Sequence, residues 1–521
     1  MGISIKKIKL INFKRFREYT ICPNEHMNIL VGDNETGKSS VLEAIDLVAT
    51  GSIKRIESIG LDRLLNVEAV SEFKNGEHSF EKLPKLIIEL YLEGQFDYTM
   101  NGKNNTENIE CDGIRLLCEP NLDYRNEIAT ILAETPDYFP YDYYSIRFST
   151  FMDAGYTSYK KKLHCIFIDS SNMNSTFATT DFVKRMYMQH TEEDVKERAL
   201  HKTKYRQMRD GFRANCLREL NSRLEASKQY EFGLKGGPDV DMESDLMIYE
   251  KGVGIDSKGT GRQIFIKTDF ALERSQKNVD VILIEEPENH LSPVNLRKLV
   301  QEIGNSQTGQ IFISTHNSFI GTRLEIDNLM IMQPASLNKP LMLKELSEET
   351  AKYFMKAPPA GIIEFALAEK IILVEGPSEY MLLEKFYIEQ LARKPEADGV
   401  HIIDVRGLSF KRYLDIAKLT ECKVAVITDN DANFEKNCEK KYLEYNSFHN
   451  IKVFYDSDNQ KSTFEIVLYN DNAMLCTNLF GDNAQDYMLH NKTEAAYRLL
   501  CQEQPINVPD YIRRAIEWIK E

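Results

Sequence analysis

Short apolar runs separated by polar turns occur in two stretches of the chain. Residues 1–50 predict two strands, a loop and a helix, and residues 250–335 contain the runs VILI and IFIS, which are typical of buried parallel strands. From residue 365 onward, the runs KIILVEG, VHIIDV and KVAVITDND alternate with predicted helices, which indicates a second parallel α/β unit. We therefore expect an N-terminal α/β domain over residues 1–355 and a C-terminal α/β domain over residues 365–521.

A helical insertion is predicted inside the N-terminal domain, at about residues 180–235. Its segment 196–223 carries nine Lys and Arg against three Asp and Glu, a local net charge of +6. Because helical spacing puts these charges on several faces, two interpretations stay open. The segment is either a solvated or dimerising helix, or a helix that contacts a phosphate backbone. The stretch KAPPAG at 356–361 predicts a linker between the two domains.

Composition narrows the classes of function. The net charge of −15 separates this chain from proteins that wrap nucleic acid non-specifically, which are usually basic, so any nucleic-acid contact must use local basic patches. The nine cysteines form no CxxC pair, which argues against a structural zinc site and is typical of a reducing, cytoplasmic environment. No apolar run approaches the roughly 20 residues of a membrane span, so we expect no membrane association.

A nucleotide-binding loop is predicted at Gly32–Ser39, which matches the pattern G-x-x-x-x-G-K-[ST] between a predicted strand and a predicted helix. Its glycines allow backbone N–H groups to surround phosphate oxygens, and the following helix N-terminus adds a positive dipole. Lys38 should reach the β- and γ-phosphates, and the Ser39 hydroxyl should ligate Mg²⁺. The residues expected to bind ATP here are Gly32, Asn34, Gly37, Lys38, Ser39 and Ser40.

Two later strands end in residues that suit ATP hydrolysis. The run VILI is followed by Glu285, expected to hold Mg²⁺, and by Glu286, expected to polarise the attacking water. The run IFIST is followed by His316, which can sense a γ-phosphate from a strand end. Each residue alone would more often be solvated or structural, and their order along the chain favours the functional interpretation.

Taken together, these motifs resemble the ABC-type ATPase head of the SMC/RecF class. In that class a signature motif completes the ATP site of a second subunit, and Ser257, Gly259 and Gly261 occupy the corresponding position. The resemblance therefore implies a homodimer or a higher even oligomer. The chain departs from the class at Glu285, where Asp is usual, and no Q-loop glutamine can be placed.

A second cluster of acids is predicted in the C-terminal domain. Glu375 follows the apolar strand IILV, and Asp429 and Asp431 follow the strand VAVIT. Ligand groups gather at the carboxyl ends of parallel strands, so we expect these three carboxylates to meet. They would repel one another unless a cation neutralised them, and Mg²⁺ or Mn²⁺ suits oxygen ligands. The sequence therefore predicts a metal site.

The E-G strand followed by D-x-D resembles a Toprim domain, and a Toprim domain behind an ABC head resembles the OLD (overcoming lysogenization defect) nucleases, most closely the class that contains the Gabija anti-phage nuclease subunit. Glu465 in Thr463-Phe464-Glu465 matches the family's T-x-E element, which implies a further metal ligand. Lys492 in Asn491-Lys492-Thr493 matches the N-K-T element, which implies a lysine facing the scissile phosphate. Three further acids cannot be placed from the sequence, namely Glu379, Asp404 and Asp456.

The resemblance thus implies an ATP-regulated DNA endonuclease that hydrolyses phosphodiesters with two metal ions. The resemblance adds a role in defence against phage and a UvrD-like helicase as a further partner. Two alternatives remain: a Toprim nuclease that cuts RNA such as tRNA, and a non-cleaving, ATP-gated DNA clamp or sensor.

Overall fold

The computed structural model describes most of the chain. The described residues are 3–32, 36–94, 98–135, 138–158, 160–169, 176–191, 194–224, 231–234, 242–289, 291–305, 309–316, 320, 328–332, 338–342, 349–350, 362–405, 409–420 and 422–521. Contacts along the chain define two compact units, the first built mainly from Met1–Leu30 and Asn34–Asn317, the second mainly from Leu341–Glu521. The predicted boundary at 355 and the predicted linker lie outside the described residues.

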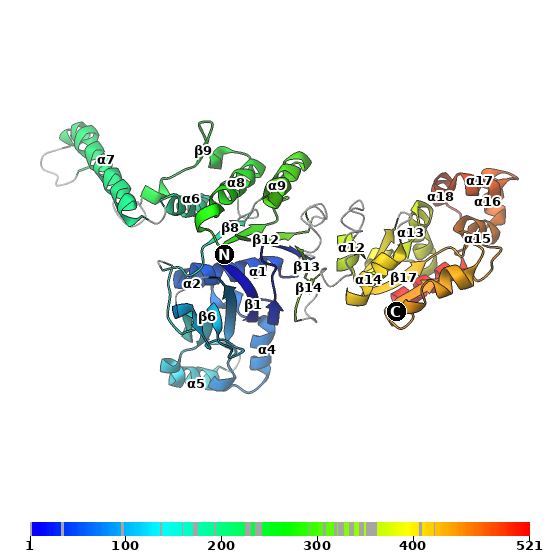
Figure 1. Ribbon diagram of the computed structural model, residues 1–521, viewed down its shortest axis with the longest axis horizontal. Helices are drawn as coiled ribbons and strands as arrows, with labels where there is room; N and C mark the ends of the chain where they lie inside the picture. Colours follow the sequence, from blue (N-terminus) through cyan, green and yellow to red (C-terminus); the bar gives the residue numbers. More distant parts are fainter. Residues whose placement is uncertain are drawn as a thin grey trace. The chain divides into compact units, whose positions relative to one another are not determined.

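The first unit contains an antiparallel sheet (Figure 1). Its strand order is β2-β1-β4-β6-β5, and β7 also pairs with β6. The bounds are β1 Ser4–Phe13, β2 Phe16–Ile21, β4 Leu86–Glu93, β5 Asn101–Gly102, β6 Cys111–Pro120 and β7 Tyr144–Thr150. Helices α2 (Ile53–Ile59), α3 (Leu61–Leu64), α4 (Val67–Asn75) and α5 (Arg125–Glu134) belong to the same part of the chain.

The first unit also contains the strands β3-β12-β11-β8 of a six-stranded sheet, in which β8, β11 and β12 are parallel. The bounds are β3 Met27–Val31, β8 Cys165–Asp169, β11 Val281–Glu285 and β12 Gln310–Thr315. Every residue of β11 and β12 is buried, as expected for parallel strands covered on both faces. Helix α1 (Lys38–Thr50) contacts β4 and β6 of the antiparallel sheet as well as β8, β11 and β12, so it is sandwiched between the two sheets.

The remaining helices of the first unit include the predicted insertion. Helices α6 (Thr176–His190) and α8 (Thr260–Asn278) contact each other and β8, and α8 also contacts α9 (Pro293–Asn305). Helix α7 (Val195–Ser222) is capped by Asp194 and has no buried residue. The described residues also form two short antiparallel pairs, β9 (Tyr249–Glu250) with β10 (Val253–Gly254) and β13 (Leu329–Ile331) with β14 (Leu341–Met342).

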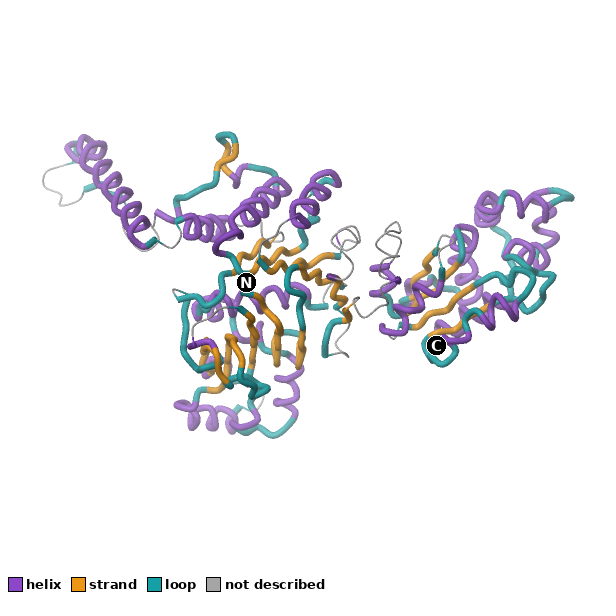
Figure 2. Tube along the Cα trace, in the orientation of Figure 1, coloured by secondary structure: helices purple, strands orange, loops and turns teal. Residues whose placement is uncertain are grey.

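The second unit is built on a four-stranded parallel sheet with the order β16-β15-β17-β18 (Figure 2). Consecutive residues of its central strands β15 and β17 are buried, which means that both faces of the sheet are covered. Helix α19 contacts β15, β17 and β18, helix α13 contacts α19 and β16, and helix α14 contacts β17 and α12. The bounds are β15 Lys370–Val374, β16 Val400–Asp404, β17 Lys423–Ile427, β18 Ile451–Phe454, α12 Ile362–Leu367, α13 Pro377–Leu391, α14 Phe410–Thr420, α15 Phe464–Asp471, α16 Ala473–Phe480, α17 Ala484–His490, α18 Lys492–Leu500 and α19 Asp510–Lys520.

The predicted fold class is confirmed: an α/β unit with inserted helices precedes a second α/β unit with a parallel sheet. Among the described residues, no helix is long and apolar enough to cross a membrane.

Candidate functional site

The predicted nucleotide loop joins β3 to α1. Gly37 has a positive φ of 96°, and a Cβ atom there would overlap the ring of Phe16, so this turn requires glycine. Lys38 is the first residue of α1 and is only 4% exposed, while Ser39 and Ser40 follow in the first helical turn, where free N–H groups attract anions. Gly32 follows β3 directly, whereas Asn34 lies outside the described residues.

A buried acid lies beside this loop, at the carboxyl end of β11. Glu285 is 9% exposed and accepts a hydrogen bond from the Ser39 side chain. Burial raises the pKa of Glu285 to about 7, and the charges of Asp169 and Glu286 add to that rise, against the effect of the Ser39 hydrogen bond. Asp169 ends the neighbouring strand β8 in direct register with Glu285. A divalent cation at this point would remove the repulsion between the carboxylates.

Glu286 and His316 meet at the ends of β11 and β12. Glu286 has a positive φ of 41°, a strained conformation that is often found at functional sites, and its N–H donates to Ser314 O at 2.9 Å. Nδ1 of His316 lies 3.7 Å from Oε1 of Glu286 and 3.7 Å from Oε1 of Glu288. Glu288 in turn accepts hydrogen bonds from the Thr315 hydroxyl at 2.6 Å and the His316 N–H at 3.1 Å. The predicted water-polarising acid and γ-phosphate sensor are therefore neighbours.

The predicted signature segment leads into α8. Ser257 ends a short 3₁₀ turn, Gly259 precedes the helix, and Gly261 lies in its first turn. A Cβ atom on Gly259 would meet no atom within 4 Å, so the backbone there is open to approach. Glu250 pairs with Lys258 at 3.2 Å and also with Arg262, which braces the segment from one side. A role across a subunit interface stays a prediction.

In the second unit, Glu375 and Asp429 meet at the carboxyl ends of the paired strands β15 and β17. Oε1 of Glu375 accepts hydrogen bonds from the Thr428 hydroxyl at 2.5 Å and from the Asp429 N–H at 3.1 Å. The third predicted acid, Asp431, lies in a left-handed turn with φ of 48°, and its N–H donates to Ser462 O at 3.1 Å.

Three helices bring further charges to the same end of the sheet. Glu379 is in the first turn of α13, Glu465 is in the first turn of α15, and Lys492 begins α18. Nζ of Lys492 donates to Oε2 of Glu465 at 3.0 Å, and the Glu465 side chain is only 5% exposed. The predicted T-x-E acid and N-K-T lysine are therefore directly paired.

The acids of this site raise one another's pKa values. Burial raises the pKa of Asp429 to about 8, and the charges of Glu375, Glu379 and Glu465 add to the rise while Lys492 opposes it. Burial likewise raises the pKa of Glu379 to about 7, reinforced by Glu465 and Glu375. The site is thus short of positive charge, and hard cations that prefer oxygen ligands fit its donors. In their present positions, no three His, Cys, Asp or Glu side chains of the described residues are close enough together to bind one metal ion. To bind a cation, Glu375 and Glu465 would therefore have to exchange their present hydrogen bonds for metal bonds.

Comparison with known proteins finds three family models that match parts of the chain. The family description "AAA ATPase domain" matches residues 4–231, "AAA domain, putative AbiEii toxin, Type IV TA system" matches residues 190–320, and "Overcoming lysogenization defect protein-like, TOPRIM domain" matches residues 367–431. The chain carries an AAA ATPase domain and an OLD-like TOPRIM domain. The TOPRIM match includes Glu375, Asp429 and Asp431 and ends before Glu465 and Lys492.

Curated relatives share parts of the chain. Endonuclease GajA of Bacillus cereus is 24% identical over 238 residues, which are 43% of this chain and 41% of the relative. The DNA replication and repair protein RecF of Clostridium kluyveri is 28% identical over 136 residues, which are 26% of this chain and 35% of the relative. The chain thus spans well under half the length of these relatives. Among solved structures, an Smc head bound to the C-winged helix domain of ScpA matches with 16% identity and a TM-score of 0.33, over 66% of this chain and 99% of that chain.

Three acids in the AAA ATPase and TOPRIM domains were not among the predicted site residues. Asp169 follows the apolar run CIFI, the same signal that marked Glu285, so the pattern could have identified it. Glu379 stands four residues after Glu375, beyond the start of a helix, but only the fold shows that it turns toward Asp429. Glu288 carries no sequence signal, because its contact with His316 depends on how two strand ends meet.

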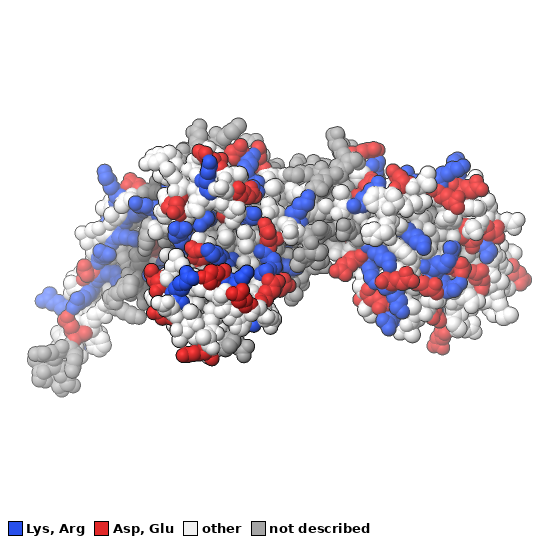
Figure 3. Space-filling view, turned by 90° about the horizontal axis from the view of Figure 1, so that it is seen from below, with Lys and Arg blue, Asp and Glu red and all other residues white. Residues whose placement is uncertain are grey.

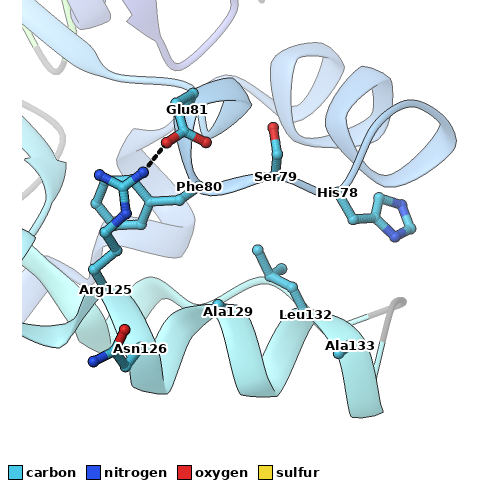
Figure 4. A pocket seen from close by; sticks show the side chains of 9 residues that line it. All are labelled: His78, Ser79, Phe80, Glu81, Arg125, Asn126, Ala129, Leu132 and Ala133. Carbon is cyan, nitrogen blue, oxygen red and sulfur yellow. Dashed lines mark hydrogen bonds and ion pairs between the residues drawn. The ribbon is translucent and has the colours of Figure 1, made fainter.

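The surface carries scattered charges (Figure 3), and one pocket has no predicted site residue in its lining. Figure 3 shows basic and acidic side chains interspersed over one face of the molecule, in keeping with the acidic composition. A pocket of about 510 Å³ lies in the AAA ATPase domain between the turn at Phe80 and helix α5 (Figure 4). Glu81 and Arg125 form an ion pair at its edge, Ala129 and Leu132 contribute an apolar side, and none of its lining residues is a predicted site residue.

Proposed function

We propose that this chain is an ATP-dependent nuclease that cuts DNA with the help of divalent cations. The observation that carries the proposal is the cluster of Glu375, Glu379, Asp429 and Glu465, in which partly or fully buried carboxylates lie next to one lysine. Such a cluster is costly for stability, because each ionised group raises the pKa of its neighbours. A metal-dependent hydrolytic site would explain why the chain retains a cluster that lowers its stability.

In the TOPRIM domain, the acidic side chains and Lys492 would carry out phosphodiester hydrolysis. Glu375, Asp429, Asp431 and Glu465 would hold the cations, joined by Glu379. The Thr428 hydroxyl and Asp429 N–H orient Glu375 for that task. When bound, the cations would supply charge stabilisation and a more acidic water. Lys492 would offset the negative charge that develops on the phosphate in the transition state. The assignment requires no His, Ser or Cys nucleophile.

On the ATPase side, the loop around Gly37 would hold the phosphates, with Lys38 as their cation and Ser39 and Glu285 at the Mg²⁺ position. Glu286 would orient the attacking water, and His316 would report the γ-phosphate to it. Glu288 fixes the backbone of His316 and so keeps that contact in place.

The proposal extends to partners. We propose a homodimer or higher even oligomer, a cytoplasmic location, a UvrD-like helicase as a further partner and a role in defence against phage. The oligomer rests on the resemblance to ABC-type ATPase heads, and the location rests on the cysteine pattern. The helicase and the defence role rest on the resemblance to OLD-type nucleases of the Gabija class. The endonuclease name of one relative supports cleavage, and the DNA replication and repair name of the RecF relative supports a role on DNA. A non-cleaving DNA clamp stays the alternative.

The decisive experiment incubates the purified chain with plasmid, short DNA duplexes and tRNA, each with Mg²⁺ or Mn²⁺, with and without ATP. Metal-dependent cleavage of DNA that EDTA stops would support the proposal. Cleavage of tRNA alone would favour the ribonuclease alternative. ATP-dependent retention of DNA without cleavage of any substrate would favour the clamp.

A further inference from the structure

Asn430, the middle residue of the Asp429–Asp431 segment, makes an unusual set of contacts for a residue between two predicted metal ligands. It is 1% exposed. Its side-chain Nδ2 donates to the backbone carbonyl oxygens of Asp456 at 2.8 Å, Asp458 at 2.9 Å and Lys461 at 3.2 Å. Its Oδ1 accepts the Ala432 N–H at 2.9 Å. All hydrogen-bonding atoms of the amide are therefore engaged.

The three carbonyl groups belong to one loop, residues 455–463, which leads from β18 to α15. The loop has internal bonds of its own, from the Asp458 N–H to Oδ1 of Asp456 at 2.8 Å and from the Lys461 N–H to Asp458 O at 2.9 Å. The end of the loop next to α15 is also bonded to the segment after β17, since the Asp431 N–H donates to Ser462 O. Asn430 and its neighbour thus join the end of β17 to the start of α15.

This junction lies between two acids of the candidate metal site. Asp429 immediately precedes Asn430, and Glu465 stands in the first turn of α15, two residues beyond the loop. Glu465 is close enough to act on the charge of Asp429. Other ties to the loop also involve side chains: the Arg514 guanidinium donates to Tyr455 O at 3.3 Å, and the Tyr455 hydroxyl donates to Oε1 of Glu439 at 3.1 Å. Asn430 differs from them because its one side chain binds three carbonyl groups of the loop.

We infer that Asn430 is a positioning residue that sets the spacing between the Asp429 and Glu465 carboxylates. The inference rests on the proposed metal-dependent function of this site. Asparagine suits the role because its amide offers two N–H groups to the carbonyls and an oxygen to Ala432, whereas aspartate would set a carboxylate against three carbonyl oxygens. Residues that hold metal ligands in place typically contribute 10–100-fold to metal affinity or activity.

The test compares Asn430→Ala with Asn450→Ala in the full chain. Asn450 is a matched control: it is buried, and its Nδ2 bridges the carbonyl oxygens of Ala417 at 3.1 Å and Cys422 at 2.8 Å, at the opposite end of the same sheet. Mn²⁺ binding is followed by electron paramagnetic resonance of the free ion. Amide hydrogen exchange is followed in the metal-free protein, and circular dichroism reports folding.

We expect Asn430→Ala to bind Mn²⁺ about 10–100-fold more weakly and to exchange faster over residues 456–466. Asn450→Ala should retain the wild-type Mn²⁺ affinity and the protection of that loop. A folded Asn430→Ala with wild-type Mn²⁺ affinity would overturn the inference, even if loop exchange increased, because the residue would then be merely structural. Should Asn430→Ala fail to fold, Asn430→Ser keeps a hydroxyl donor, and an unchanged Mn²⁺ affinity in that variant together with faster loop exchange would overturn it equally.

Failure of the proposed function would look different. If the wild-type chain bound Mn²⁺ at this site but cleaved no nucleic acid, the nuclease proposal would fall while the comparison of Asn430 and Asn450 would still decide the positioning role.

Discussion

At the scale of single residues, Asp429 combines burial with three acidic neighbours. Replacing it by asparagine preserves its shape and removes the charge that a cation needs. We expect Asp429→Asn to lower DNA cleavage by at least about 100-fold, more than a residue that only positions ligands, while ATP binding stays unchanged. Cleavage of a labelled duplex and fluorescence titration with an ATP analogue measure the two effects. Asp486→Asn, on the exposed face of α17, is the control and should cleave normally. Comparable cleavage by both variants would contradict the assignment.

The raised pKa values of this cluster predict that its Mn²⁺ affinity increases with pH. The pKa values of Asp429 and Glu379 are raised to about 8 and about 7, above those of unfolded chains, so bound protons stabilise the metal-free fold at low pH. That contribution is lost as pH rises through about 7 to 8. Metal binding must displace these protons, so Mn²⁺ affinity should rise across the same interval. Calorimetric titrations at pH 6 and pH 8.5 measure the change, and Asp429→Asn should show a smaller one. An affinity independent of pH would count against a cation at this cluster.

At the scale of elements, the turn between β3 and α1 depends on Gly37. Alanine there meets two obstacles, the positive φ of 96° and the ring of Phe16. Gly252 is a matched control in the same unit, with φ of 77° and no atom within 4 Å of its Cβ position. The Gly252→Ala variant should lose about 1 kcal/mol of folding stability from backbone strain alone. Gly37→Ala should lose about 1–3 kcal/mol more from overpacking and should bind ATP poorly. Thermal unfolding and nucleotide titration compare the two, and equal behaviour would mean that Phe16 does not constrain the turn.

The elements that carry both sites could be predicted because each is a short apolar strand followed at once by a polar or glycine-rich tip. The runs before Gly32, Glu285, Glu375 and Asp429 all appear as buried strands. What could not be predicted is the set of side chains that other elements bring to those tips. The pairing of Lys492 with Glu465 and the contact of Glu288 with His316 depend on helix packing and strand register, which local patterns do not encode.

At the scale of the whole molecule, the Ser257–Gly261 segment predicts assembly. Its open backbone at Gly259 offers N–H groups to a phosphate, and in the resembling ATPase heads that phosphate belongs to a second subunit. Two-fold assemblies are also the commonest oligomers. We expect mass photometry to detect species of at least twice the chain mass of 60.2 kDa, with a larger share when ATP is present. Gly259→Asp should reduce the ATP-dependent share by placing a carboxylate against the phosphate. A monomer at every concentration, with and without ATP, would refute the prediction.

The last prediction concerns communication between the AAA ATPase domain and the TOPRIM domain, which share one chain. ATP can change the cleavage rate only if it binds the cutting and resting states with different affinities. ATP held between two subunits would supply that difference, because the contact exists in only one arrangement. We therefore expect ATP to change the cleavage rate about 5–150-fold, the range of typical coupling energies of 1–3 kcal/mol.

The sign of this effect is open from the sequence, although the resemblance to the Gabija nuclease class favours restraint at high ATP. The measurement is a titration of ATP into a cleavage assay at constant free Mg²⁺, since ATP chelates the metal and would otherwise imitate inhibition. Lys38→Ala is the control, because it removes the buried cation that would contact the phosphates but leaves the TOPRIM acids intact. Wild-type cleavage should respond to ATP and the variant should not. If the cleavage rate of both proteins were unaffected by ATP, nucleotide binding would not regulate the nuclease. If ATP lowered the cleavage rate of both proteins equally, the inhibition would come from a second nucleotide-binding site.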